Sequence, residues 1–212
     1  MINSEETLMK RAYVVRTSGR AYGWHGMRTY RKLFPSESGV LHGHLSRLDR
    51  EERSLRFMGA LSDDAVKEYC RSLNWFRTVV VGFFHEGVLR GSAEVTVPSG
   101  QFPILCEVAI SVEHAWQHQG IGTELFRRML LIARNRAVRQ ARITCFTHNH
   151  RIRHIAAKFG ARFRCKDGEF EADLPLDTMT FSSFWEEALA DNLGWVNTWF
   201  DGIKQVHVTS LR

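Results

Sequence analysis

The sequence predicts an α/β (α+β) fold, in which helices flank a mixed and mostly antiparallel sheet. Three observations predict it. Helical and strand-like segments are mixed along the chain, and two pairs of strands are joined by short turns typical of hairpins. A strand, a glycine-containing loop and a long helical segment also follow one another, as in a βαβ unit with parallel strands. The 212 residues suffice for one sizeable core and at most a small second module.

The first part of the chain predicts one strand and then helices. Residues 10–16, KRAYVVR, have the composition of a strand, and a polar, glycine-containing stretch follows them. Residues 41–59 look helical, but Asp49 and a glutamate three residues later have capping-box spacing, so a new helix is expected to begin there. Another helix is predicted over 61–73, with Ser62 as its N-cap.

The middle of the chain alternates between strand and helix periodicity. β-branched and aromatic runs indicate strands, while apolar residues at three-and-four spacing indicate helices. Gly160 is the expected C-cap of the second helix in this part. The predicted elements are a hairpin of strands 75–87 and 88–97, a strand over 103–113, a helix over 120–138, a strand over 141–147, a helix over 148–160 and a hairpin over 161–176.

The last segment is rich in aromatic residues at helical spacing, over 181–200. This pattern predicts an amphipathic helix. We therefore expect a main domain over 1–176 and a C-terminal helical extension over 177–212. The extension is expected to pack on the domain or to form a contact in a homodimer, and a lid over the substrate site is a further alternative.

Composition is that of an ordinary globular protein, with 44% hydrophobic and 25% charged residues. No apolar run approaches the roughly 20 residues of a membrane span, and the N-terminus lacks the pattern of a secretory signal. The four cysteines form no CxxC pair, which favours reduced thiols. We therefore expect a cytoplasmic protein with no membrane partner.

The formal net charge is +6, and arginines cluster in residues 126–142 and 148–166. This basic character fits either a solvated face or attraction for a phosphorylated ligand. No nucleic-acid-binding motif accompanies the arginines, so no nucleic-acid partner is expected. The histidine-rich stretch HNHRIRH (148–154) lacks a carboxylate or cysteine at metal-ligand spacing, so no metal is expected.

The loop WQHQGIG (116–122) lies between a predicted strand and the longest predicted helix. A Walker A loop would need a lysine after the glycines, and a dinucleotide loop would need a third glycine, so both are weak matches. The pattern Gln117-x-x-Gly120-x-Gly122 instead opens the helix directly. Amide groups at a helix start have no internal partner, and they can bind a diphosphate that approaches closely where Cβ atoms are missing. A plain tight turn is the other interpretation.

The sequence from Glu107 to Arg134, which contains this loop, resembles the cofactor-binding core of the GNAT N-acetyltransferases. ARITCFTHNHRIRHIAAKFGARF (141–163) is similar to the next strand and helix of that family. SRLDREERSLRFMG (46–59) and the strand EVAISV look like the acetyltransferase domain of bacterial protein-lysine acetyltransferases. The resemblance implies a GNAT fold over 1–176.

The resemblance also implies acetyl-CoA as the acyl donor and assigns residues that bind it. The strand before the loop would hold the pantetheine arm by backbone hydrogen bonds, and the loop amides would hold the pyrophosphate. The positions that match are Ile110, Ser111 and Val112 for the arm, Gln117, His118, Gln119, Gly120, Ile121, Gly122 and Thr123 for the pyrophosphate, and Asn149 as a further contact of the arm.

The implied reaction is direct attack of a primary amine, of a protein lysine or a small molecule, on the thioester. A lysine-like amine has a pKa near 10.4, so a base must remove its proton. Glu107 is the expected general base, because it interrupts an apolar strand at a position where several family members have a glutamate. Glu94 and His114 are reserve candidates.

One position departs from the family. Many members have a tyrosine that is proposed to protonate the departing thiolate, and Ala156 occupies the matching position here. Water or one of His148, His150 and His154 could replace it. The missing tyrosine and the aromatic tail leave an alternative function, a non-catalytic acyl-CoA-binding sensor or interaction module.

Overall fold

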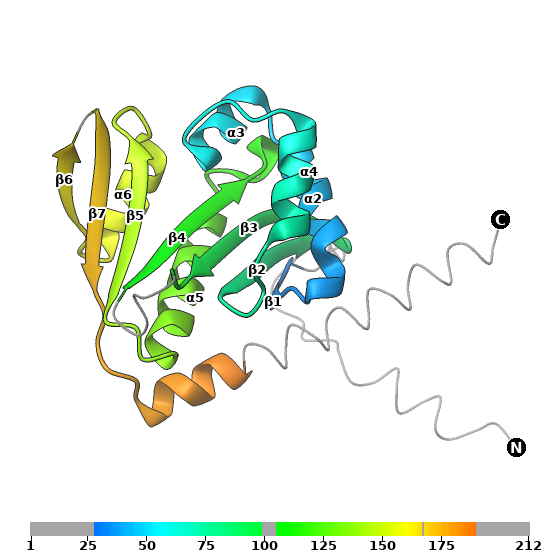
Figure 1. Ribbon diagram of the computed structural model, residues 1–212. Coiled ribbons are helices and arrows are strands. Elements are labelled where there is room, and N and C mark those ends of the chain that lie inside the picture. Colours follow the sequence, from blue (N-terminus) through cyan, green and yellow to red (C-terminus); the bar gives the residue numbers. More distant parts are fainter. Residues whose placement is uncertain (1–27, 99–104, 167, 190–212) are drawn as a thin grey trace, which may run out of the picture.

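The computed structural model describes residues 28–98, 105–166 and 168–189, which form a mixed sheet flanked by helices (Figure 1). The sheet has seven strands in the order β1-β2-β3-β4-β5-β7-β6. Neighbouring strands are antiparallel except for β4 and β5, which are parallel. This arrangement confirms the predicted α/β (α+β) class and its parallel portion.

The helices and strands largely follow the predicted order. The strands are β1 (Arg28–Lys32), β2 (Thr78–His85), β3 (Val88–Thr96), β4 (Leu105–Val112), β5 (Gln140–Phe146), β6 (Arg162–Lys166) and β7 (Glu169–Pro175). The helices are α2 (Ser38–Arg47), α3 (Arg50–Phe57), α4 (Asp63–Ser72), α5 (Ile121–Asn135) and α6 (His150–Lys158), with short 3-10 turns η1 (Pro35–Glu37) and η2 (His114–Trp116). None of the described helices has the length and hydropathy that crossing a bilayer requires.

Strand β1 lies in the stretch where the sequence predicted no element. Its buried positions are Thr29 and Arg31, and the Arg31 guanidinium is paired with Glu37 at 2.6 Å. Because the buried side chains are polar, the strand lacks the apolar alternation by which strands are found in a sequence. The strand predicted over 10–16 lies outside the described residues.

The helix starts agree with the predicted caps. The Asp49 carboxylate accepts from the Glu52 amide at 2.7 Å, and the Glu52 carboxylate accepts from the Asp49 amide at 3.1 Å. This capping box separates α2 from α3, as expected. Ser62 caps α4 by accepting from the Ala65 amide at 3.2 Å. After α6, Gly160 adopts the left-handed conformation expected of a glycine that ends a helix, with φ +82°.

Two hydrophobic cores lie on opposite faces of the sheet. Helix α5 packs on β2, β3 and β4, with Phe126 and Met129 fully buried against strand residues such as Val95. Helices α2 and α4 cover the other face, where Leu45 and Val66 are fully buried. The sheet is therefore the middle of three layers, and its central strand β4 has helices on both sides.

Strands β4 and β5 part soon after they meet. They pair over only three positions, from Leu105 with Gln140 to Glu107 with Arg142. Beyond Glu107, β4 continues to pair with β3 but has no partner strand on its β5 side. Figure 1 shows the two strands diverging toward the end of β4. This divergence leaves a row of backbone N–H and C=O groups on β4 available to a ligand.

The C-terminal segment is helical over 181–189, and the rest of the predicted aromatic helix lies outside the described residues. This helix contacts the domain through polar groups. Ser183 is 1% exposed and donates to Asn135 Oδ1 at 2.6 Å, and Glu187 accepts from Asn135 Nδ2 at 2.7 Å. Phe181 and Trp185, in contrast, are exposed. The expected contact with a second copy of the chain therefore stays a prediction.

Candidate functional site

A cleft of about 530 Å³ opens where β4 and β5 part. The end of β4, the loop before α5, the first turn of α5, helix α6 and helix α3 form its walls. Most of the residues predicted to bind the cofactor line it, namely Ile110, Ser111, Val112, Gln117, His118, Gly120, Ile121, Gly122, Thr123 and Asn149. Gln119 is not part of the lining, and its side chain instead accepts from Arg28 at 2.6 Å.

The loop turns sharply into α5 because two of its residues have positive φ. Gly120 has φ +80°, a left-handed conformation that favours glycine, and His118 has φ +58°. In the described chain, no recorded hydrogen bond engages the amides of residues 118–120, and the amides of the first turn of α5 have no helical partner either. A helix start lined by free amides has a partial positive charge and is suited to a diphosphate.

Position 122 favours glycine for a different reason, the close approach of helix α6. A Cβ added there would lie 3.1 Å from Ile155 Cδ1 of α6, tighter than ordinary contacts. A side chain at this position would therefore press against α6, which forms the opposite wall of the cleft. The two glycines thus have separate roles, one in the backbone conformation of the turn and one in the spacing of the two helices.

Helix α6 contributes a cationic wall that was only partly predicted. Asn149 caps this helix, with Oδ1 accepting from the Ile152 amide at 3.3 Å, and it also lines the cleft. Arg151 and Lys158 line the cleft as well, as do two of the three histidines of the HNHRIRH stretch. The arginine-rich composition of this segment was the available signal, and the structure places part of that charge at the site.

Ser111 is held by a buried network behind the cleft. Its Oγ lies 2.9 Å from His44 Nε2, and His44 Nδ1 lies 3.2 Å from Glu113 Oε1. Arg47 and Arg90 donate to the same Glu113 carboxylate at 2.8 and 3.0 Å. Burial lowers the pKa of His44, so that its imidazole is neutral at pH 7. These contacts tie β4 to α2 and fix the strand that lines the cleft.

Helix α3 forms a wall that the sequence analysis did not predict as part of the site. Glu52, Leu55 and Arg56 line the cleft. Gln117 connects this wall to the loop, since its Nε2 donates to Glu52 Oε1 at 2.6 Å and to the Val112 carbonyl at 2.8 Å. Burial raises the pKa of Glu52. No local pattern marked these residues as part of the site, because they reach the cleft only through tertiary packing.

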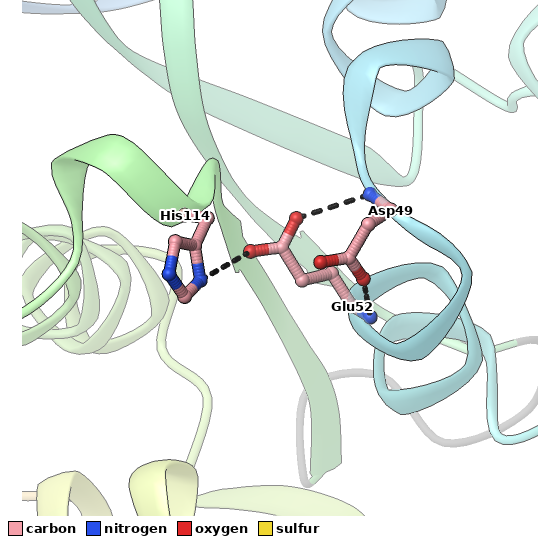
Figure 2. Close-up of side chains that lie close together, drawn as sticks. All are labelled: Asp49, Glu52 and His114. Atoms are coloured by element: carbon pink, nitrogen blue, oxygen red, sulfur yellow. Dashed lines mark hydrogen bonds and ion pairs between the residues drawn. The ribbon is translucent and has the colours of Figure 1, made fainter.

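Asp49 and Glu52 at the start of α3 lie close to His114 of η2 (Figure 2), with ligand atoms of the three residues within 4.8 Å of one another. The two carboxylates already accept each other's amides in the capping box, and Glu52 also accepts from Gln117. His114 Nδ1 lies 3.9 Å from Glu52, and this histidine side chain is 77% exposed. The cluster is therefore explained as a helix cap with an exposed neighbouring histidine.

The reserve base Glu94 is engaged in a buried ion pair. Its carboxylate lies 2.6 Å from Arg56 Nη2, and it also accepts from the Tyr69 hydroxyl. The side chain is only 3% exposed. A carboxylate that compensates a buried guanidinium cannot readily accept a further proton, so this geometry favours a structural role for Glu94.

The predicted general base Glu107 is exposed and lies outside the cleft lining. It stands opposite Thr96 on β3, and Glu94 stands opposite Ala109, so both glutamates project from the same face of the sheet. Glu107 also occupies the last position at which β4 and β5 pair. It therefore lies three residues before Ile110, the first lining residue of β4, on the side away from the loop. Ala156, at the matching position of the family tyrosine, is fully buried.

Solved structures with the same fold include several acetyltransferases. The GNAT domain of S. lividans PAT is 18% identical, with a TM-score of 0.62 over 71% of this chain and 92% of that one. The yncA protein of Salmonella typhimurium, solved with acetyl-CoA, is 15% identical, with a TM-score of 0.57 over 73% and 96%. PaiA N-acetyltransferase of Thermoplasma acidophilum, solved with coenzyme A, is 16% identical, with a TM-score of 0.54 over 70% and 99%.

These low identities show a shared fold. No curated protein sequence matches the chain. The profile of the acetyltransferase (GNAT) family, however, matches residues 28–161, which is more than half of the chain. This segment contains the parting strands, the loop before α5 and all the walls of the cleft. The protein therefore belongs to the GNAT family of acetyl-CoA-dependent acetyltransferases.

Proposed function

We propose that this protein transfers an acetyl group from acetyl-CoA to the primary amine of a protein lysine or a small molecule. The observation that carries the proposal is one continuous cleft that joins the unpaired edge of β4 to the free amides at the start of α5. The edge suits a pantetheine arm with its two amide groups, and the helix start suits a pyrophosphate. Two structural neighbours that are solved with acetyl-CoA or coenzyme A have the same fold.

Charge on the opposite wall supports the same ligand. Arg151 and Lys158 line the cleft on α6, across from the loop. Coenzyme A carries a diphosphate and a further phosphate, so cationic groups in this wall would add long-range attraction to the short-range bonds of the amides. In this proposal the loop orients the donor and α6 raises its local concentration.

Glu107 is the proposed general base. An incoming ammonium must lose a proton before its nitrogen can attack, and an exposed carboxylate can take that proton directly or through water. Glu107 lies on β4, five residues before the pantetheine-binding edge ends at Val112, or about 17 Å along the strand. In the proposed binding mode, the thioester of an extended donor would lie at the end of the cleft remote from the pyrophosphate, on the side of Glu107.

The Glu107→Gln variant tests this assignment. With acetyl-CoA and a panel of amines, release of free thiol should fall about 100-fold or more, in the range typical of a lost general base. The affinity for coenzyme A, measured by calorimetry, should stay within about twofold. Glu68→Gln is the matched control, because Glu68 is an exposed glutamate on α4 outside the cleft lining. Unchanged turnover in Glu107→Gln would remove this residue from the mechanism.

A second candidate is a non-catalytic acyl-CoA sensor. Two observations favour it: the predicted base lies outside the cleft lining, and a buried alanine replaces the family tyrosine. The same experiment separates the two functions. Tight binding of acetyl-CoA with no thiol release across protein and small-molecule amines would support the sensor, whereas turnover with any amine would exclude it.

A further inference from the structure

A buried charged cluster lies behind the cleft, built from α3, β3 and α4. Arg56 Nη2 lies 2.6 Å from Glu94 Oε1 and 3.0 Å from the Tyr69 hydroxyl, which itself donates to the other Glu94 oxygen. The side chains of Arg56 and Glu94 are 6% and 3% exposed. Because an ion pair this deeply buried is costly to desolvate, its contribution to stability is small, and its position next to a ligand cleft suggests a functional role.

The cluster presents one charge to the cleft. Of its three members, only Arg56 belongs to the lining, while Glu94 and Tyr69 stand behind it. The Arg56 Nε group is buried and has no hydrogen-bond partner among the described residues. Arg56 therefore presents a guanidinium to the cleft, while Glu94 behind it balances the charge, and Glu94 and Tyr69 hold the guanidinium in a fixed orientation.

The position of Arg56 along the cleft follows from its neighbours. Helix α3 runs opposite to β4: its early residue Glu52 binds Gln117, which also holds the carbonyl of Val112. Arg56 lies one helical turn later and is paired with Glu94, which stands opposite Ala109. Arg56 thus lies between the amides that would hold the diphosphate and the exposed Glu107 beyond.

We propose that Arg56 is a catalytic residue that stabilises the thiolate released from acetyl-CoA. This inference rests on the proposed acetyl transfer. In the reaction, the amine nitrogen forms a bond to the carbonyl carbon, and the carbon–sulfur bond breaks with its electron pair going to sulfur. The amine proton goes to Glu107 or water, and the thiolate is paired with the guanidinium until it takes a proton from solvent after release.

In this role Arg56 would stabilise the departing thiolate in place of the tyrosine that many family members have and that this chain lacks. A tyrosine acts by donating a proton, whereas an arginine side chain keeps its proton in proteins and acts through its charge. A cation that is fixed in a water-poor site before the reaction stabilises developing negative charge without having to reorganise. Glu94 and Tyr69 are then positioning residues, since they hold the guanidinium without touching the sulfur.

The test measures the pKa of the thiol in bound coenzyme A, from the ultraviolet absorbance of the thiolate across a pH series. Bound to the wild-type protein, the thiol should titrate below the pKa of about 8.5 of a free thiol. The double variant Arg56→Met/Glu94→Gln removes both buried charges together, which avoids leaving one of them uncompensated. It should raise the bound thiol pKa by about one and lower kcat about tenfold, with KM for acetyl-CoA within about twofold.

Two further variants define the interpretation. Arg56→Lys keeps the charge and should retain part of the lowered thiol pKa. Arg50→Met removes an exposed charge from the same helix, outside the cleft lining, and should change neither the thiol pKa nor kcat. A thiol that titrates in the wild-type complex as it does in free coenzyme A, or that is unaffected in the double variant, overturns the role of Arg56.

Failure of this inference and failure of the proposed function give different results. A protein that binds coenzyme A and acetylates amines with an unperturbed bound thiol refutes only the role of Arg56. A protein that shows no binding of coenzyme A by calorimetry refutes the proposed function, and the role of Arg56 falls with it.

Discussion

Single residues decide the shape of the loop that would hold the diphosphate. Gly120 has φ +80° and caps α5 without a side chain. A Cβ there would meet no atom within 4 Å, so the only obstacle to a larger residue is the left-handed backbone. We predict that Gly120→Ala lowers the free energy of unfolding by about 1 kcal/mol. Urea denaturation measures this change.

Gly43 provides the control, because it lies within α2 and its backbone is helical. A Cβ at this position would be at ordinary contact distance, 3.5 Å, from Arg47 Nη1. Alanine is the better helix former, so Gly43→Ala should raise the free energy of unfolding by about 0.5–1 kcal/mol. If the free energy of unfolding falls equally in both variants, the left-handed backbone of the loop is not the reason why glycine is favoured at position 120.

Most of the residues that could be predicted at the site lie in one continuous stretch, and Asn149 is the exception. The loop from Gln117 to Thr123 was identified because a glycine loop at a helix start is a local pattern, and Ile110 to Val112 were assigned through the resemblance to the family. Glu52 and Arg56 were not identified as site residues. They reach the cleft only because α3 folds over β4, and no spacing within the helix distinguishes a wall of a cleft from an ordinary buried face.

At the scale of elements, helices and strands with a strong local pattern could be predicted from the sequence. The contacts that an element makes with the rest of the domain could not. The hairpin of β2 and β3 was predicted from its turn, and the start of α3 from its capping box. Strand β1 was missed because its buried residues are polar. The helix over 181–189 was predicted from its aromatic spacing, but it contacts the domain through Ser183 and Glu187 while its aromatic side chains are largely exposed.

Asn135 at the end of α5 makes three of the hydrogen bonds that join this helix to the domain, beside ion pairs of Glu186 and Glu187. Its Nδ2 donates to the Ser183 carbonyl at 2.9 Å and to Glu187 at 2.7 Å, and its Oδ1 accepts from the Ser183 hydroxyl at 2.6 Å. Asn135→Ala removes all three bonds and leaves the buried Ser183 hydroxyl with fewer partners. We predict that amide hydrogen exchange over 181–189 becomes at least about tenfold faster, since about 1.4 kcal/mol of local stability corresponds to a factor of ten.

Asn74→Ala is the control for that experiment. The Asn74 side chain likewise bonds to the backbone, with Oδ1 accepting from the Phe76 amide at 3.1 Å, but Asn74 lies just before β2. Exchange over 181–189 should be unchanged in this variant. If the helix exchanges as slowly in Asn135→Ala as in the wild type, then its attachment depends on contacts other than these three bonds.

For the molecule as a whole, the two hairpins and the parallel pair of strands could be predicted from the sequence, but the cleft between β4 and β5 could not. A strand, loop and helix leading to another strand predicted the parallel pair, because the helix returns the chain to the end of the sheet where the first strand began. The early parting of β4 and β5 has no counterpart in either strand's sequence. It depends on how the two halves of the sheet pack on α5 and α6, which is a property of the assembled domain.

The packing of α2 against the sheet makes stability of the whole domain depend on pH. Burial lowers the pKa of His44 below its ordinary value of 6.5, and Glu113 beside it only partly opposes this shift. In the unfolded chain the imidazole binds a proton more readily than in the folded one. The contribution of His44 to the free energy of unfolding is therefore complete above pH 6.5, and it is lost as the pH falls below that value.

Two nearby carboxyl groups, those of Glu113 and Glu52, change the free energy of unfolding at lower pH than His44 does. Burial alone would raise the pKa of Glu113, but hydrogen bonds from His44, Arg90 and Arg47 lower it overall, so its contribution is lost as the pH falls below about 4.5. Burial raises the pKa of Glu52, which has the opposite sign and favours the folded state in acid. The loss that begins near pH 6.5 should therefore belong to His44, before either carboxyl group contributes.

We predict that the free energy of unfolding, measured with urea, decreases between pH 7.5 and 5.5 in the wild-type protein. In His44→Gln this slope should become shallower, even if the variant is less stable throughout, because the amide can bond to its neighbours but does not titrate. His42→Gln, on the same helix, is the control and should keep the wild-type slope. If His44→Gln loses stability with acid as steeply as the wild type, another group must take up the proton on unfolding.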